Sequence, residues 1–501
     1  MKSTAPVVWL VVWMLVVAGS TEPRAQRAGP VAVIEVLQGK VEVSQVSDQL
    51  WEAAKTNMTL LAGASIRTGI RSRALLRIVT ADRQFIEIGE ASLMKLQARV
   101  EGKELPQLTF DWGKFRWQSR TKAEELPFQT PVVACGAKGT EFNVVVEPGT
   151  GRTTITMLDG EVEIRNTSGR EVLSSGEEGI VEPGREPTRR QAVNVVDVIQ
   201  WSLYYPAVVA LEDLPWVGQV PADLEPSLNA YRSGDLLAAL DLYPTNHVAE
   251  GGADQLYRAA ILLAVGQVDE SERRLSRIDP TDSAARPARA LRHLVATVGL
   301  RVVDFDSPPS TASEWLAQSY QLQQQRKLPE ALAAARQAAQ LQPGFGFAWA
   351  RVAELEFGRG YISAARVAAR QAVAFSPRYA PAVALLGFLA AAQGRVQDAA
   401  AQFEQAISLD GAYAPAWLGR GLCQIRRNRL EAGRRDLQTA ATLETHRGLY
   451  HSYLGKALSA NGDSHLAGLE LEEAKRLDPA DPTAWLYSAL VAQEQNRINP
   501  R

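Results

Sequence analysis

The chain has 501 residues, a formal net charge of −2 and an apolar content of 46%. The length predicts two to four domains, and the apolar fraction is typical of a folded globular protein. The balanced charge creates no global field that would draw the chain to nucleic acid or to an acidic membrane. Its two cysteines, Cys135 and Cys423, fall in segments that we assign to different domains, so we expect buried thiols without a disulfide framework.

The N-terminal segment 1–20 has the features of a secretory signal peptide. Lys2 precedes an apolar run from Val7 to Val17, and small residues follow as far as Ser20. The run is shorter than the roughly 20 residues that a membrane-spanning helix needs. We therefore expect cleavage between residues 20 and 28 and an exported protein, periplasmic or extracellular. The alternative is an uncleaved segment that anchors the chain in the inner membrane.

Residues 30–190 alternate apolar and polar side chains, which predicts an all-β domain. The strongest turn signal is Asp159-Gly160 within Thr154–Ile164, because Asp-Gly tolerates the positive φ of a tight hairpin turn. Val36–Val43 has the same pattern around Gly39, so we expect two related hairpins on one core. We expect the following large side chains to fill that core: Trp51, Trp112, Phe115 and Trp117.

Several motifs in this region carry a family resemblance. They are Arg67-Thr68-Gly69 with Ser72 and Ala74, Thr130-Pro131, Gly139–Val144, and Leu158–Val162. On these motifs, residues 60–184 resemble the FecR domain, the periplasmic all-β part of bacterial iron-transport regulators. The resemblance implies a relay from an outer-membrane receptor and no catalytic residues. Only Met1–Pro6 precede the apolar run, which leaves no room for those regulators' sigma-factor-binding segment, so we do not expect sigma-factor control.

A change of pattern follows the sheet region. We assign residues 191–220 to a linker with a short helix that ends before Pro206. Its aromatic residues Trp201, Tyr204 and Tyr205 are expected to pack the sheet against the first helices; a ligand-binding aromatic patch is the alternative. Residues 221–306 have a helical period without a fixed repeat, and we interpret them as degenerate repeats that cap an array.

Residues 315–484 repeat at a fixed interval of about 34 residues, which is the period of a helix–turn–helix unit. Mostly large residues share one position of the unit: Trp315, Trp349, Val383, Trp417, His451 and Trp485. Small residues share two others: Ala331, Ala365, Ala399, Gly433 and Ala467; Ala338, Ala372, Ala406, Ala440 and Ala474. Because only small side chains let two helices cross closely, we expect the small residues to lie buried between paired helices.

This pattern resembles five units of the tetratricopeptide repeat (TPR). Gly387, Gly421 and Gly455 match its small first-helix position, and Pro343, Pro377 and Pro479 match its closing position, where Gly411 and Thr445 depart from proline. The resemblance implies a solenoid that binds a protein or peptide in a concave groove. The family's groove positions give these candidate binding residues: Tyr320, Gln323, Gln324, Glu354, Phe357, Phe388, Leu422, Ile425, Arg426 and Lys456. Residues 485–501 form a half repeat, which is either a capping helix or a sign of truncation.

No catalytic, metal or cofactor motif stands out. The five histidines lack zinc-site spacing, and residues 136–140 lack the glycine spacing of a phosphate loop. An arginine cluster within 426–435 indicates either a solvated helix end or a site for an acidic partner. We therefore expect an N-terminal all-β FecR-like domain followed by an all-α TPR solenoid. The expected function is a non-catalytic scaffold of the bacterial envelope, and the alternative is a periplasmic signal relay coupled to an outer-membrane receptor.

Overall fold

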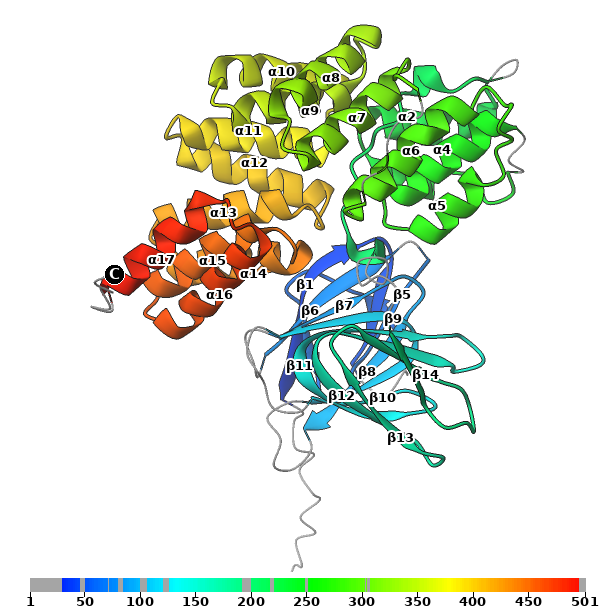
Figure 1. The fold of residues 1–501 in the computed structure, drawn as a ribbon, viewed down its shortest axis with the longest axis vertical. Helices are drawn as coiled ribbons and strands as arrows, with labels where there is room; N and C mark the ends of the chain where they lie inside the picture. Colours follow the sequence, from blue (N-terminus) through cyan, green and yellow to red (C-terminus); the bar gives the residue numbers. More distant parts are fainter. Residues whose placement is uncertain are drawn as a thin grey trace, which may run out of the picture.

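The computed structural model describes residues 29–45, 50–70, 72–79, 84–99, 106–119, 126–191, 200–216, 220–247, 251–301, 303 and 307–494. The expected signal peptide lies outside these residues. Strands occupy the described chain as far as residue 191, and helices follow (Figure 1). The prediction of a sheet region followed by a helical-repeat region is confirmed. None of the described helices combines the length and the apolarity that crossing a membrane requires.

The strands of the sheet region belong to one continuous hydrogen-bonded network. They are β1 (Pro30–Gln38), β2 (Val41–Ser44), β3 (Glu52–Ala53), β4 (Thr59–Leu61), β5 (Ser65–Thr68), β6 (Arg73–Ile78), β7 (Gln84–Ile88), β8 (Leu93–Arg99), β9 (Pro106–Ser119), β10 (Leu126–Gln129), β11 (Ala134–Val146), β12 (Thr153–Arg165), β13 (Arg170–Ser174), β14 (Glu177–Val181) and β15 (Thr188–Gln191). The main path runs β15-β14-β12-β11-β10-β9-β7-β6-β1-β4, and β8 joins β9 to β5.

Long strands bend at glycines and so change partners along their length. β9 pairs with β8 through its first half and with β7 and β11 through its second half. Gly113 lies at this change with φ +113°, and a Cβ there would come within 2.0 Å of Ser92 Oγ. Phe115 and Trp117 are buried in the core as expected, but Trp51 lies half-buried under Arg67, and Trp112 is 40% exposed.

The predicted hairpin turn at Asp159-Gly160 is wrong. β12 continues through this dipeptide and stays paired with β11 on both sides, with an irregular register opposite Gly139. Gly160 has φ +111°, which bends the strand from its partner β14 to its partner β13. The second predicted hairpin is also a bend, because β1 and β2, on either side of Gly39, pair with different strands. In both places the positive φ of a glycine therefore allows a strand to bend and does not reverse the chain.

The helices of the second part form an arch whose two ends lie above the sheet region (Figure 1). They are α2 (Glu225–Ser233), α3 (Leu236–Asp241), α4 (Gly252–Leu263), α5 (Val268–Leu275), α6 (Ala285–Val298), α7 (Ala312–Gln324), α8 (Leu328–Leu341), α9 (Gly346–Gly358), α10 (Ile362–Phe375), α11 (Ala380–Ala392), α12 (Val396–Leu409), α13 (Ala414–Arg426), α14 (Leu430–Leu443), α15 (Gly448–Ala460), α16 (Ser464–Leu477) and α17 (Pro482–Glu494). From α7 onward, odd-numbered first helices alternate with even-numbered second helices. The first helices begin at a constant interval, at positions 312, 346, 380, 414, 448 and 482.

The small residues of the repeat lie where the paired helices cross, as predicted. All nine alanines at the two small positions are fully buried, and Gly433 is buried with them. A Cβ at Gly421 would lie 3.0 Å from Gly433 O, and one at Gly455 would lie 3.1 Å from Ala467 O. The close approach of backbones therefore excludes larger side chains from these positions.

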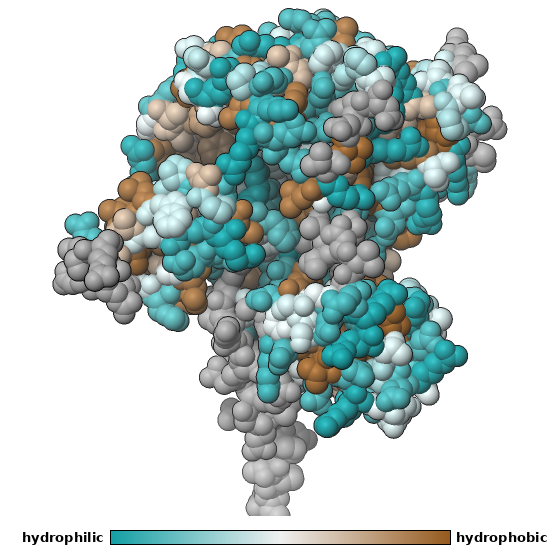
Figure 2. Space-filling view, in the orientation of Figure 1, coloured by the Kyte–Doolittle hydropathy of each residue, from teal (hydrophilic) through white to brown (hydrophobic). Residues whose placement is uncertain are grey.

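The large residues of the repeat also fasten the turns between units. The indole Nε1 atoms of Trp349, Trp417 and Trp485 donate to carbonyl oxygens in the turns that precede their helices, at 2.8, 2.8 and 3.0 Å. His451 makes the equivalent contact, because its Nε2 lies 3.0 Å from Thr445 O. At the end of the array, brown patches adjoin the grey C-terminal residues in Figure 2, and α17 exposes Trp485, Leu486 and Leu490.

Candidate functional site

Part of the linker runs as an extended, buried strap (residues 203–210) through the helical array. Tyr205 and Ala207–Ala210 are buried among side chains of α2, α4, α6 and α7. The strap's backbone is held from both sides: Tyr231 Oη donates to Val209 O at 2.9 Å, and Ala210 N donates to Ser313 Oγ at 2.9 Å. Extended backbone of the protein's own chain therefore occupies part of the array's inner face.

A cavity of about 520 Å³ lies where this strap meets the inner face of the array. The strap and the neighbouring helix α6 form one wall, with Leu203, Tyr204, Pro206, Leu294, Thr297, Val298 and Leu300. The first helices and the turns before them form the other wall, with Tyr320, Gln323, Gln324, Arg351, Glu354, Tyr379, Pro381, Tyr413, Pro415, Glu444, His446, Arg447 and Asp478. One end of the strap thus forms one side of an open chamber to which several units of the array contribute.

Four tyrosines from separate elements line this cavity: Tyr204, Tyr320, Tyr379 and Tyr413. The rings of Tyr204 and Tyr413 lie 5.2 Å apart between centroids. Burial raises the pKa of each phenol well above its usual value, and the charge of Glu354 raises it further for Tyr320, Tyr379 and Tyr413. All four hydroxyls therefore stay protonated at neutral pH and can donate hydrogen bonds.

The charged groups of the cavity are paired within the protein. The Arg351 side chain is fully buried, donates to Ser319 Oγ at 3.0 Å and to Glu354 Oε2 at 2.9 Å, and lies 4.0 Å from the centre of the Tyr320 ring. Arg447 contacts Glu444 at 3.2 Å. Asp478 accepts from Arg326 at 2.8 Å, which joins the turn after α7 to the turn after α16 across the array. Ion pairs from both ends of the repeat array therefore lie at the edge of the cavity.

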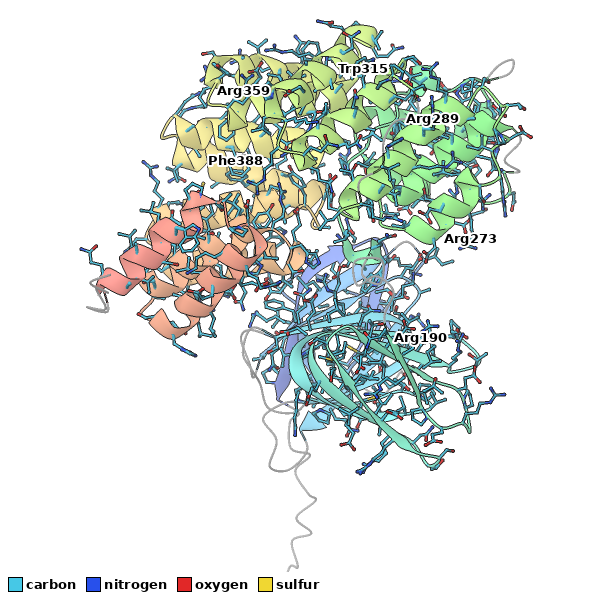
Figure 3. All side chains as sticks on the ribbon, in the orientation of Figure 1. Arg190, Arg273, Arg289, Trp315, Arg359 and Phe388 are labelled. Carbon is cyan, nitrogen blue, oxygen red and sulfur yellow. The ribbon has the colours of Figure 1, made fainter. Side chains whose placement is uncertain are left out.

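The ten predicted groove residues fall into two zones. Tyr320, Gln323, Gln324 and Glu354 line the cavity. The other six lie farther along the first helices: Phe357, Phe388, Leu422, Ile425, Arg426 and Lys456. We call four of these, Phe357, Phe388, Leu422 and Ile425, the apolar row; all four are half-buried, and Phe388 marks the row's place on the array in Figure 3.

Ring contacts hold the apolar row in place. Phe357 and Phe388 have centroids 6.1 Å apart, and Phe388 packs edge-on against Phe403 at 4.7 Å. Beyond the row, Arg426 is exposed at the end of α13, and Lys456 Nζ lies 3.3 Å from Tyr487 Oη and over the Tyr487 ring. The row is thus a preformed apolar surface with two cations beside its C-terminal end.

Some residues that line the cavity were not among the groove residues predicted from the sequence. Tyr379 and Tyr413 occupy the same position of the repeat, each directly before a first helix, and Arg447 occupies this position in the next unit. The constant spacing of these three residues could therefore have been used to predict them from the sequence. The strap residues Leu203, Tyr204 and Pro206 have no such signal, because their place in the cavity depends on contacts with distant segments.

The sheet region contacts the array close to the cavity. Arg116 of β9 is buried, and it donates to Glu141 Oε1 at 2.8 Å, Ser202 Oγ at 2.9 Å and Thr445 Oγ1 at 2.6 Å. Gln38 Nε2 donates to Asp410 Oδ1 at 2.7 Å. Ser202 and Thr445 each immediately precede a residue that lines the cavity. A buried polar contact therefore connects the sheet with both walls of the chamber.

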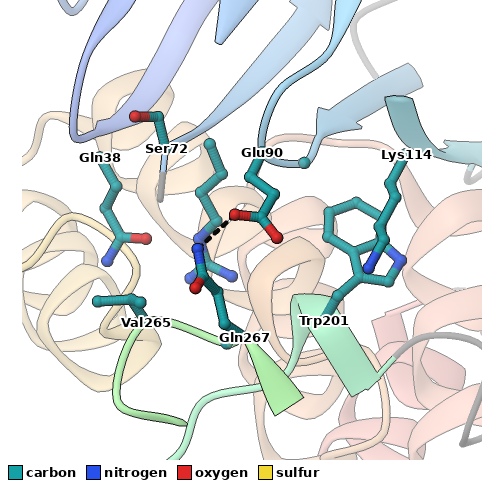
Figure 4. A pocket seen from close by; sticks show the side chains of 10 residues that line it. Gln38, Ser72, Glu90, Lys114, Trp201, Val265 and Gln267 are labelled. Atoms are coloured by element: carbon teal, nitrogen blue, oxygen red, sulfur yellow. Dashed lines mark hydrogen bonds between the residues drawn. The ribbon is translucent and has the colours of Figure 1, made fainter. Parts of the chain in front are cut away.

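The other end of the array meets the sheet at the turn between α4 and α5. Figure 4 shows Gln267 of this turn hydrogen-bonded to Glu90, with Trp201 beside Lys114. The Trp201 indole donates to Asn143 Oδ1 at 3.3 Å, and it packs so closely on Gly89 that a Cβ there would lie 3.1 Å from the ring. Of the linker aromatics, Trp201 thus contacts the sheet, and Tyr204 and Tyr205 contact helices.

No protein-family model matches the chain, and no curated protein matches it in sequence. Solved structures similar to part of it include a thermophilic TPR protein from Thermus thermophilus, with 21% identity, covering 36% of this chain and all of that one, at a TM-score of 0.33. PilF from Pseudomonas aeruginosa has 15% identity over 37% of this chain and 84% of its own, at a TM-score of 0.31. YrrB, a TPR protein with an unusual peptide-binding site, has 15% identity over 36% and 92%, at a TM-score of 0.25.

Proposed function

We propose that the chain is an exported, non-catalytic scaffold of the bacterial envelope that binds a protein partner through the inner face of its helical array. The observation that carries the proposal is the apolar row, which stays partly exposed along three successive first helices. Large apolar side chains that remain accessible on a well-packed repeat array are typical of a protein-binding surface. The cations of Arg426 and Lys456 beside the row favour a partner with acidic residues next to its apolar ones.

The strap supports an extended peptide as the part of the partner that is bound. It lies in the array with its backbone hydrogen-bonded to helix side chains and its apolar side chains buried. An extended segment of the partner that inserts beside the strap would make the same kinds of contact. Its backbone polar groups would bond to helix side chains, and its apolar side chains would pack on the apolar row. The strap leaves the row available, so we expect the partner peptide to lie along α9, α11 and α13.

The test is capture of partners from envelope extract by the full chain and by its variant Arg426→Glu/Lys456→Glu. Both side chains are exposed, so the variant reverses charge beside the row without disturbing the core. We expect it to lose the captured partner while its melting temperature stays within the error of the wild type. Phe388→Ala is a poorer probe, because the lost ring contact with Phe403 lowers stability as well.

The matched control is Arg370→Glu/Arg395→Glu, which makes the same charge change at exposed positions outside the groove positions. Equal capture by all three proteins would contradict the proposed site. Export has a separate readout, because the protein recovered from a periplasmic fraction should begin at a residue between 21 and 29. A protein that retains Met1 would support the anchored alternative instead.

The contact through Arg116 favours a second candidate function, a signal relay from an outer-membrane receptor through the FecR-like sheet region. Arg116 touches Ser202 and Thr445, which adjoin both walls of the cavity, so a rearrangement in the sheet would reach the array directly. An outer-membrane protein captured equally by the wild type and by Arg426→Glu/Lys456→Glu would favour this relay over the scaffold.

A further inference from the structure

The cavity beside the strap has the size and the lining of a ligand site. Its volume of about 520 Å³ lies within the range of roughly 300–1,000 Å³ that is common for small-molecule and side-chain pockets. It exceeds by far the roughly 30 Å³ that one water molecule fills. The space is therefore sufficient for one long side chain together with a short piece of backbone.

The aromatic lining of the cavity favours a cation. Tyr204, Tyr320, Tyr379 and Tyr413 surround it, and the face of an aromatic ring carries partial negative charge that attracts ammonium and guanidinium groups. The protein already uses this interaction on the same wall, where the Arg351 guanidinium lies 4.0 Å from the centre of the Tyr320 ring.

Both arginine side chains of the lining are engaged, and two acceptor groups of the lining are open. Arg351 donates to Ser319 and Glu354, and Arg447 donates to Glu444, so both guanidinium groups have anionic partners. Glu354 has only its Oε2 atom in that pair and remains 48% exposed. Gln324 Oε1 is buried and has no hydrogen-bond partner among the described residues. A ligand that donates N–H groups therefore matches the atoms that are still unpaired.

The ion pairs of the lining point in the same direction. The cavity is lined by three carboxylates and two guanidinium groups, and Arg326 pairs with the carboxylate of Asp478, so acidic and basic groups are equal in number. A cation placed near Glu354 would meet a carboxylate of which only one oxygen is engaged, whereas an anion would have to displace one of the existing pairs.

We propose that this cavity binds an organic cation, a guanidinium or ammonium group, with Glu354 and Gln324 as acceptors and the tyrosine rings as its walls. The inference rests on the proposed function and deepens it, since an extended partner peptide along the groove would insert a lysine or arginine side chain here. A free amine or guanidinium compound has the same chemistry and is the alternative source of the group.

The experiment is calorimetric titration of the full chain with three blocked pentapeptides and one free compound. The peptides carry arginine, citrulline or glutamate between two pairs of glycines, and the free compound is methylguanidinium. We expect the arginine peptide to bind at least ten times more tightly than the citrulline peptide, which has nearly the same shape without the charge. If methylguanidinium binds as tightly as the arginine peptide, the ligand of the cavity is a free cationic small molecule. The preference for a cation would then stand, and the assignment to a peptide side chain would not.

Variants connect the binding to the cavity. Glu354→Gln keeps the shape of the side chain and removes its charge. It should therefore lower the affinity for the arginine peptide about tenfold and leave the affinity for the citrulline peptide unchanged. Glu330→Gln, an exposed position on α8, is the control. Melting curves of both variants show whether the loss of the Arg351 contact has altered the fold; Gln324→Leu gives a second test that leaves this contact intact.

Two results would overturn the inference: equal affinity for the arginine and citrulline peptides, or tighter binding of the glutamate peptide. Failure of the inference and failure of the proposed function are distinguishable. If Arg426→Glu/Lys456→Glu loses the partner but no arginine peptide binds, the scaffold stands and the cation site does not. If the arginine peptide binds in a manner that depends on Glu354 but no partner is captured, the reverse holds.

Discussion

His247 lies near the start of the helical array and contacts two carboxylates through its two ring nitrogens. Nδ1 lies 2.7 Å from Asp223 Oδ2, and Nε2 lies 2.5 Å from Asp254 Oδ2 of α4. Burial alone would lower the pKa of His247, but the hydrogen bonds to Asp254 and Asp223 together outweigh it, and the pKa is raised above its usual value. The charged imidazolium is therefore better accommodated in the folded chain than in the unfolded one.

This raised pKa makes stability depend on pH. A group that binds its proton more tightly when folded adds stability that is fully present below its unfolded pKa of about 6.5 and is lost as the pH rises through the folded pKa. We therefore expect His247→Gln to lower the melting temperature more at about pH 6 than at about pH 9. Circular dichroism melts at the two pH values measure this, with the exposed His465→Gln as control. An equal loss at both pH values would contradict the assignment.

At the scale of elements, the two turns that depart from the closing proline are those that touch the sheet. A Cβ at Gly411 would lie 3.1 Å from the Val36 side chain of β1, so a proline there would force Val36 to shift. Thr445 places its hydroxyl 2.6 Å from Arg116 Nη2, a bond that proline cannot make. Where the repeat loses its closing residue, the chain has therefore acquired a contact with the other region.

Thr445→Val tests this explanation. The substitution keeps the shape of the side chain and leaves the buried Arg116 without one of its acceptors, at a cost of about 1.5–3 kcal/mol in free energy of unfolding for a hydrogen bond to a charged group. Urea denaturation followed by tryptophan fluorescence measures the cost. Thr439→Val is the control, because the Thr439 hydroxyl donates to Arg435 O within the same helix. If both variants lose the same free energy of unfolding, the contact with Arg116 does not stabilise the fold more than an ordinary hydrogen bond within a helix.

The period of a pattern determines how much of each element can be predicted from sequence. The constant spacing of Trp, Ala and Gly specifies where every helix from α7 to α17 begins, because each unit packs only on its neighbours. The bends at Gly39 and Gly160 could not be told from hairpin turns, since positive φ at glycine is common to both. The cavity was predictable in part: Tyr320 and Glu354 follow from the repeat, whereas Tyr204 depends on where the strap lies.

For the whole molecule, the decisive question is what holds the arch over the sheet. Besides the polar contacts of Arg116, Gln38 and Gln267 described above, two contacts can be compared. Arg326 and Asp478 join the arch across its inner side, but both side chains are exposed, by 68% and 40%, and such a pair is worth at most about 1 kcal/mol. Val36, Leu75 and Phe85 face away from the sheet's own core and are buried in one cluster with side chains of α13 to α17. Burial of these apolar groups favours the closed arrangement much more strongly.

The two contacts can be separated by measuring the radius of gyration of the full chain by small-angle X-ray scattering. Arg326→Glu should leave it unchanged, because the apolar cluster persists without the ion pair. Val36→Asp places a charge in that cluster while leaving the sheet's own core, to which Val36 does not belong, intact. We therefore expect the radius to increase as the sheet separates from α13–α15, with the strand signal in circular dichroism preserved. An increase with Arg326→Glu and none with Val36→Asp would mean that the arch is closed by its own two ends and not by the sheet beneath it.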